Sequence, residues 1–117
     1  MADSKKCVAL VGKDIAQARR FSSAVQLFHS KKGFGLRMVE GDNLSRIFNL
    51  FEIWKPAFIF FHADIRNKNP EALDVLIKAT NILLPATKVF EFNSDTELRI
   101  LVMEEIRTME AANGNTK

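Results

Sequence analysis

The chain has 117 residues, of which 47% are hydrophobic and 26% are charged, with 17 basic and 14 acidic side chains. This length suits one domain with one core, and the composition is that of an ordinary globular protein. No apolar run approaches the ~20 residues of a membrane span, and a net charge of +3 is far from the concentrated basic surface of a dedicated nucleic-acid binder, so the composition argues against membrane insertion and against a nucleic-acid partner.

The compartment is indicated by the start of the chain and by its cysteine content. Residues 1–6 are mostly polar and charged and do not resemble a secretory signal. Cys7 is the single cysteine, so no internal disulfide can form. Both features favour the cytoplasm.

The first strand and helix are predicted from residues 7–33. Residues 7–11 are an unbroken apolar run, which is typical of a strand buried on both faces. Asp14 followed by Gln17 indicates a helix start, and apolar residues recur at helical spacing over 15–28. Gly33, preceded by two lysines, predicts where this helix ends.

The next segments repeat the alternation. Residues 36–39 predict a short strand whose arginine suits the edge of a sheet. Residues 44–54 carry an apolar stripe at helical spacing, and Pro56 ends that helix because the residue before a proline is disfavoured in the helical region. Residues 58–61 are a second unbroken apolar run and predict another central strand.

A third helix and a second edge strand follow. We expect residues 62–69 to form a loop. Asn69 and Pro70 then indicate the start of a helix that continues to residue 84. Residues 88–92 alternate charged and aromatic side chains, which is typical of an edge strand whose charges discourage further pairing.

The last segment predicts a helix over residues 98–109, preceded by a capping box at residues 94–97. A fifth strand over 98–103 is the alternative, which the capping box and the helical spacing disfavour. We expect a single domain over residues 1–117 with an ordered core of about 5–111 and a flexible tail at 112–117.

Together these elements predict an α/β fold. Strands that alternate with helices form a parallel sheet, because parallel neighbours need a crossover connection. If the two apolar strands are central and the two mixed strands are edges, the order is 2-1-3-4. Right-handed crossovers then give a three-layer α/β/α arrangement with two helices on each face.

Three segments show a likeness to a known family. Residues 8–14 resemble the first strand of a response-regulator receiver domain with its trailing acids. Residues 55–62 look like the family's proline and hydrophobic strand leading to the phosphoryl-accepting aspartate, and Asn93-Ser94 sits where the family has a threonine or serine. Over residues 6–94 the chain thus resembles a receiver of bacterial two-component signalling, which implies a flavodoxin-like fold.

The chain departs from this family at the positions that carry its chemistry. Receivers bind Mg²⁺ through clustered carboxylates, since hard cations prefer oxygen ligands. The acidic pair falls on Gly12 and Lys13, and Asp14 next to them is the one acid at this place. The phosphoryl acceptor falls on His62 and the hydroxyl residue on Asn93, with Ser94 one place later.

The resemblance therefore implies a pseudo-receiver: a signalling module, not an enzyme, that docks another protein of a regulatory complex without aspartyl phosphorylation, bound metal or cofactor. Two alternatives stay open. The first is a divergent phosphotransfer protein that uses His62 or Asp64, and the second is a small anion or nucleotide binder at the carboxyl ends of the strands.

Candidate site residues follow from where ligands bind in open α/β sheets, at the carboxyl ends of the strands. His62 is a phosphoryl acceptor, base or metal ligand, or else a histidine bonded to a neighbour at a strand end. Asp14 is a metal ligand or a helix cap, and Asp64 is a displaced acceptor or a solvated loop acid beside Arg66. The candidates at this edge are Lys13, Asp14, His62, Asp64, Asn93 and Ser94.

Interaction candidates lie elsewhere. Trp54 is an interface anchor or, with its place on a helical stripe, a core residue. Val89 and Glu91 belong to the last predicted strand, whose free edge either pairs with a second copy to form a homodimer or is guarded by Lys88 and Glu91.

Overall fold

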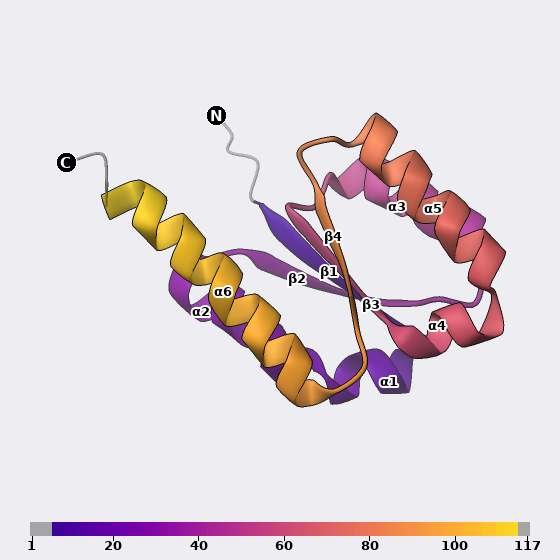
Figure 1. Cartoon of the computed structure of the whole chain (residues 1–117), viewed down its shortest axis with the longest axis horizontal. Coiled ribbons are helices and arrows are strands. Elements are labelled where there is room, and N and C mark those ends of the chain that lie inside the picture. Colours follow the sequence, from indigo (N-terminus) through magenta and orange to yellow (C-terminus); the bar gives the residue numbers. More distant parts are fainter. Residues whose placement is uncertain (1–5, 115–117) are drawn as a thin grey trace.

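The computed structural model describes residues 6–114 of the chain, which form four strands and six helices (Figure 1). The strands are β1 (Cys7–Gly12), β2 (Gly35–Glu40), β3 (Phe58–His62) and β4 (Lys88–Phe92). The helices are α1 (Ile15–Arg20), α2 (Ser22–Lys32), α3 (Leu44–Trp54), α4 (Ala63–Lys68), α5 (Pro70–Leu83) and α6 (Asp95–Gly114).

The four strands form one parallel sheet in the order β2-β1-β3-β4, which confirms the predicted fold class and strand order. Every residue of β1 and β3 is buried, as their unbroken apolar sequences require in the centre of a doubly covered sheet. Val8 aligns with Phe58 and with Leu36 across the central pairings. The arrangement is that of a flavodoxin-like three-layer fold.

Helices cover both faces of the sheet (Figure 1). The long helices α2 and α6 share one apolar cluster, in which the Phe28 ring stacks 4.8 Å from the ring of Phe58. The long helices α3 and α5 share the other cluster, in which Phe51 meets Phe61 edge to face. Two long helices therefore lie on each face, as predicted, and the short helices α1 and α4 are added to them.

The first predicted helix is divided. We expected continuous helical spacing through residues 15–28, but α1 ends and α2 begins at Phe21, whose φ and ψ are −97° and 4°. The Ser22 hydroxyl donates to the carbonyl of Arg19 across this break. The Phe21 ring packs 5.2 Å from the ring of Phe92 and 5.1 Å from that of His62, so tertiary packing determines the conformation here.

Residues 62–69 contain a helix, α4, where we predicted a loop. The helix forms because His62 caps it: its Nδ1 accepts a hydrogen bond from the amide of Asp64. A histidine is not among the usual capping residues, so the sequence carried no signal of a helix start at this place.

The last helix confirms the capping box and excludes a fifth strand over residues 98–103. Ser94 Oγ accepts from the amide of Glu97, whose carboxylate accepts in turn from the amide of Asn93. The helix continues to Gly114, beyond the predicted end at residue 109, and residues 1–5 and 115–117 lie outside the described part, so the flexibility expected of the tail at 112–117 stays a prediction. Within residues 6–114, no helix combines the length and the apolarity that crossing a membrane requires.

Candidate functional site

The candidate site lies where the two central strands end, at Gly12 of β1 and His62 of β3. The chain turns sharply after β1, and α1 comes back so closely that a Cβ atom on Gly12 would lie 2.6 Å from the amide nitrogen of Ala18 and 2.9 Å from the carbonyl oxygen of Asp14. Both are backbone atoms and neither distance is tolerated. Position 12 therefore has room for glycine only.

Gln17 connects the residues around this turn. Its side-chain oxygen accepts from the amide of Lys13 at 2.8 Å, and its Nε2 donates to Oδ2 of Asp64 at 2.8 Å. Its own amide donates to Oδ1 of Asp14, which confirms Asp14 as the cap of α1. Gln17 is buried, with 6% of its surface exposed, so both ends of its amide are used inside the protein.

The sequence showed Gln17 only as a residue supporting a helix start. The signal that could have identified Gln17 is a polar residue next to Ala18, on the side of the predicted helix that is buried. The contact between Gln17 and Asp64 cannot be predicted from spacing along the sequence.

Asp64 stands at the first turn of α4 with positive charge and a hydrogen-bond donor beside it. Besides the bond from Gln17, its Oδ2 lies 3.8 Å from Nζ of Lys13. The hydrogen bond from Gln17 is the largest cause of a pKa below the usual value of an aspartate, and His62 and Lys13 act in the same direction. Asp64 is therefore ionised and bonded to Gln17 while its side chain stays 40% exposed, and the cation paired with it is Lys13, not Arg66.

His62 is held in the core of the site. It is buried, and its ring lies 5.1 Å from the rings of both Phe21 and Phe92. Burial is the main reason that its pKa is lowered, with Lys13 and Arg20 adding to the effect and Asp64 opposing it. Because Nδ1 accepts from the amide of Asp64, the neutral ring carries its proton on Nε2.

Asn93 and Ser94 are separate from this cluster in function. Both are exposed at the start of α6, where the Asn93 amide and the Ser94 hydroxyl complete the capping box. Among the side-chain hydrogen bonds of residues 6–114, none joins either of them to Lys13, Gln17 or Asp64. The structure thus brings together Lys13, Asp14, His62 and Asp64, with Gln17 at their centre.

Arg66 forms a second polar cluster beside the site. Its guanidinium donates to both carboxylate oxygens of Glu91, at 2.9 and 3.0 Å, and to Asp74 at 2.7 Å. These bonds raise its pKa and tie α4 to β4 and α5. Glu91 is therefore engaged within the protein, as is Lys88, which lies 3.0 Å from Glu105 of α6.

The remaining interaction candidates are half-buried. Trp54 packs against the apolar cluster of α3 and α5, and the guanidinium of Arg37 lies 5.0 Å from the centre of its ring. Val89 packs against the same cluster. In the described residues, no group of three or more histidine, cysteine or acidic side chains is arranged to hold a metal ion.

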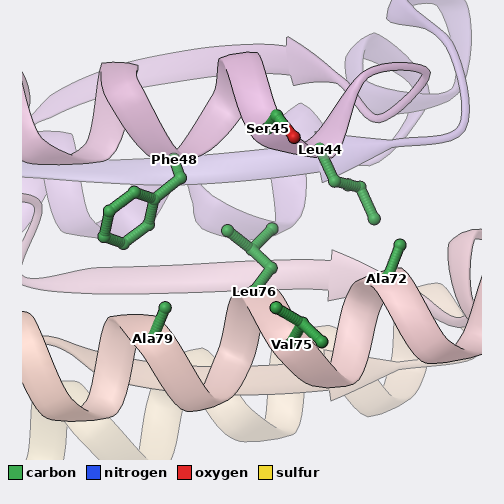
Figure 2. A pocket seen from close by; sticks show the side chains of 7 residues that line it. All are labelled: Leu44, Ser45, Phe48, Ala72, Val75, Leu76 and Ala79. Atoms are coloured by element: carbon green, nitrogen blue, oxygen red, sulfur yellow. The ribbon is translucent and has the colours of Figure 1, made fainter.

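An apolar groove of about 390 Å³ lies between α3 and α5. Figure 2 shows Phe48 and Leu44 on α3 facing Leu76 and Val75 on α5 across this groove. Val75 is 67% exposed and, like Ile53 and Ile82, is one of several large aliphatic side chains on the surface of α3 and α5. The residues that line the groove are Leu44, Ser45, Phe48, Ala72, Val75, Leu76 and Ala79.

Fold and site together define a parallel α/β protein whose strand-end cluster is internally satisfied. No family model, curated protein or solved structure matches the chain. The geometry of the molecule is therefore the basis for a functional proposal.

Proposed function

We propose that the chain is a non-catalytic, receiver-like regulatory module that binds another protein and is not switched by aspartyl phosphorylation. The observation that carries this proposal is the close backbone contact at Gly12. By the resemblance to receivers, position 12 corresponds to one of the two acids that hold Mg²⁺, and here a Cβ atom would lie 2.6 Å from a backbone nitrogen. A carboxylate at this position requires a different path of the chain.

The neighbouring charges support the same proposal. A divalent cation needs several oxygen ligands that are free to coordinate it. Asp14 caps α1 through one oxygen, and Asp64 accepts from Gln17 beside the ammonium of Lys13. A cation would have to displace the Gln17 amide and overcome the positive charge of Lys13.

The state of His62 argues against the phosphotransfer alternative. A phosphoryl acceptor needs a free lone pair on a ring nitrogen. In the neutral ring the lone pair of Nδ1 is used by the amide of Asp64, and Nε2 carries the proton. Transfer to either nitrogen requires breaking the cap of α4 or changing the tautomer of a buried ring.

The groove between α3 and α5 is the surface that we assign to the partner. Six of its seven lining residues are apolar and the seventh, Ser45, offers a hydroxyl. Such a lining suits apolar side chains of a protein, for example from one face of a helix laid between α3 and α5. It offers no charged group to a nucleotide or phosphate.

Phosphorylation is tested directly with the intact chain. Incubation with acetyl phosphate and Mg²⁺, followed by measurement of the intact mass under non-acidic conditions, should leave the mass unchanged. A phosphoryl adduct that is lost in Asp64→Asn or His62→Asn would refute the proposal in favour of phosphotransfer.

The groove is tested by comparing two exposed aliphatic residues. Val75→Asp places a charge in the groove, whereas Ile100→Asp places one on exposed α6, where the wild-type side chain is 53% exposed. Crosslinking in cells of origin should yield a protein that the wild type and Ile100→Asp retain and Val75→Asp loses. Equal recovery with all three chains would contradict the assignment of the groove.

A further inference from the structure

The outer edge of β4 is unpaired within residues 6–114. β4 is the last strand of the sheet and its one neighbour is β3. Figure 1 shows β4 in front of the other strands, between α6 on one side and α5 on the other. The edge therefore offers backbone donors and acceptors to a further strand.

The direction of these groups follows from one hydrogen bond. The amide of Lys88 donates to the carbonyl of Ala57, so Lys88 directs its backbone groups toward β3. The backbone N–H and C=O of one residue in a strand point to one side, and those of the next residue point to the other side. The backbone groups of Phe90 therefore also point toward β3, and those of Val89 and Glu91 point outward. Four backbone groups, two N–H and two C=O, are thus available.

The charges that would guard this edge are neutralised internally. Natural edge strands avoid pairing by presenting free charges, lysine above all. Here Lys88 is bound to Glu105 at 3.0 Å, and Glu91 is bound by the fork of Arg66 at 2.9 Å. β2, the opposite edge, differs, since its Arg37 and Glu40 take part in none of the ion pairs found among the described residues.

The same ion pairs place apolar side chains along the edge. Ile77 is three residues from Asp74, which binds Arg66, so it lies on the side of α5 next to β4. Leu101 is four residues from Glu105, which binds Lys88, so it lies on the side of α6 next to β4. Ile77 and Leu101, like Val89 and Phe90, are only partly buried.

We propose that β4 pairs with β4 of a second copy of this chain in an antiparallel, two-fold symmetric dimer centred on Phe90. In this register Val89 of each copy faces Glu91 of the other, so the four outward backbone groups of each copy are all bonded. The two Phe90 side chains face each other in the closely spaced, non-hydrogen-bonded pair. The sheet then continues through eight strands.

A second copy fits this edge because the pattern is self-complementary. The outward residues Val89 and Glu91 are symmetric about Phe90, and aromatic side chains meet at the centre without like charges opposite each other. The inference goes beyond the proposed function and does not depend on it. The groove between α3 and α5 is lined by residues of those two helices and by none of β4, so the proposed strand pairing does not use its lining.

The first test uses proline at the outward position 89. Val89→Pro removes an N–H that the monomer does not use, and Val89→Ala truncates the same side chain but keeps the N–H. Sedimentation velocity of the intact chain from micromolar to millimolar concentration should show a dimer for the wild type and for Val89→Ala. Val89→Pro should raise the dissociation constant at least about tenfold over Val89→Ala, since each dimer loses two hydrogen bonds.

The second test determines how the two β4 strands are aligned in the dimer, and it does not depend on whether Val89→Pro folds. In a Cys7→Ala background, Phe90→Cys should form a disulfide-linked dimer on mild oxidation, because facing Cα atoms of a non-hydrogen-bonded pair lie about 4.5 Å apart. Val89→Cys should not, because its two copies lie about 6.8 Å apart along the strands and about 4.8 Å apart across them, so their Cα atoms are farther apart than the roughly 7 Å that a disulfide can span. A chain that stays monomeric, a dimer that Val89→Pro leaves intact, or equal crosslinking of both cysteine variants would overturn the proposal.

Discussion

Gln17 and Asp64 are 47 positions apart in the chain, yet Nε2 of the first donates to Oδ2 of the second at 2.8 Å. The bond joins the first turn of α1 to the first turn of α4, directly above the ends of the two central strands. The same glutamine accepts from the amide of Lys13. One buried amide therefore holds together the segments that leave β1 and β3.

Removing this amide should destabilise the fold. Gln17→Met keeps the length and approximate volume of the side chain and loses both hydrogen bonds, which for a buried polar group costs about 1–3 kcal/mol. Urea denaturation measures the loss. Gln26→Met is the matched control, because Gln26 is exposed on α2, and its change should stay within about 0.5 kcal/mol. Equal losses in the two variants would contradict the role of Gln17.

The space at Gly12 gives a second prediction. Gly12→Ala forces the added Cβ against backbone atoms at 2.6 and 2.9 Å, so the chain must shift, at a cost of about 1–3 kcal/mol. Gly35→Ala is the control, because its Cβ would meet its nearest neighbour at 3.8 Å, an ordinary contact. Thermal unfolding should show a lower midpoint for Gly12→Ala and an unchanged or higher midpoint for Gly35→Ala. The reverse order would remove the main support for the proposed function.

The sheet could be predicted from the sequence because its signals are local. The unbroken apolar runs of β1 and β3 require burial on both faces, and the charges in β2 and β4 place these strands at the edges. With right-handed crossovers, these placements favour the strand order β2-β1-β3-β4, with β1 and β3 at the centre.

The site could be predicted only in part, because its details depend on contacts between distant residues. The break at Phe21 follows from the packing of its ring on Phe92 and His62, and α4 follows from a histidine cap. The sequence placed Arg66 beside Asp64, but its carboxylate partners are Glu91 and Asp74 on other elements. Spacing along the chain contains no information on such pairs.

The burial of His62 predicts a dependence of stability on pH. Its pKa is lowered in the folded chain, so between the ordinary value of about 6.5 and the folded value the unfolded chain binds more protons. The free energy of unfolding should therefore fall as the pH is lowered below about 6.5 and should level off below the folded pKa. Asp64 acts in a lower pH range. Because its pKa is lowered in the folded chain, its contribution to stability is present at pH values above its ordinary pKa of about 3.9 and is lost as the pH falls through its folded pKa.

His62→Asn isolates this effect, because asparagine can cap α4 through its side-chain oxygen and does not titrate. Denaturation of both chains at pH values between 5 and 7.5 should give a smaller slope for the variant than for the wild type. Equal slopes would show that another group is responsible.

Two buried threonines predict opposite outcomes for the same substitution. The Thr87 hydroxyl donates to the carbonyl of Pro56 at 2.6 Å and joins the approach to β4 with the approach to β3. Thr87→Val should cost about 1 kcal/mol. The Thr80 hydroxyl donates to the carbonyl of Leu76 within α5, an acceptor that the helix itself also uses, so Thr80→Val should be close to neutral. Urea midpoints of the two variants test the difference, and a larger loss in Thr80→Val would contradict it.

The charged hydrogen bonds of the Arg66 guanidinium predict that replacing Arg66 lowers the melting temperature by an amount that depends on salt concentration. Arg66 donates to Glu91 through two nitrogens and to Asp74 through the third, and a lysine cannot reproduce this planar geometry. Arg66→Lys should lower the melting temperature more than Arg99→Lys, because Arg99 pairs with one carboxylate, Asp95 of its own helix, and its bond to α2 goes to the uncharged hydroxyl of Ser23. The difference should shrink in about 1 M salt, where the screening length is near 3 Å. Glu91 belongs to β4, the strand of the proposed dimer, so all melts are run at one protein concentration. A difference in melting temperature that persists unchanged in high salt would assign the effect to packing of the arginine side chain instead of to its charge.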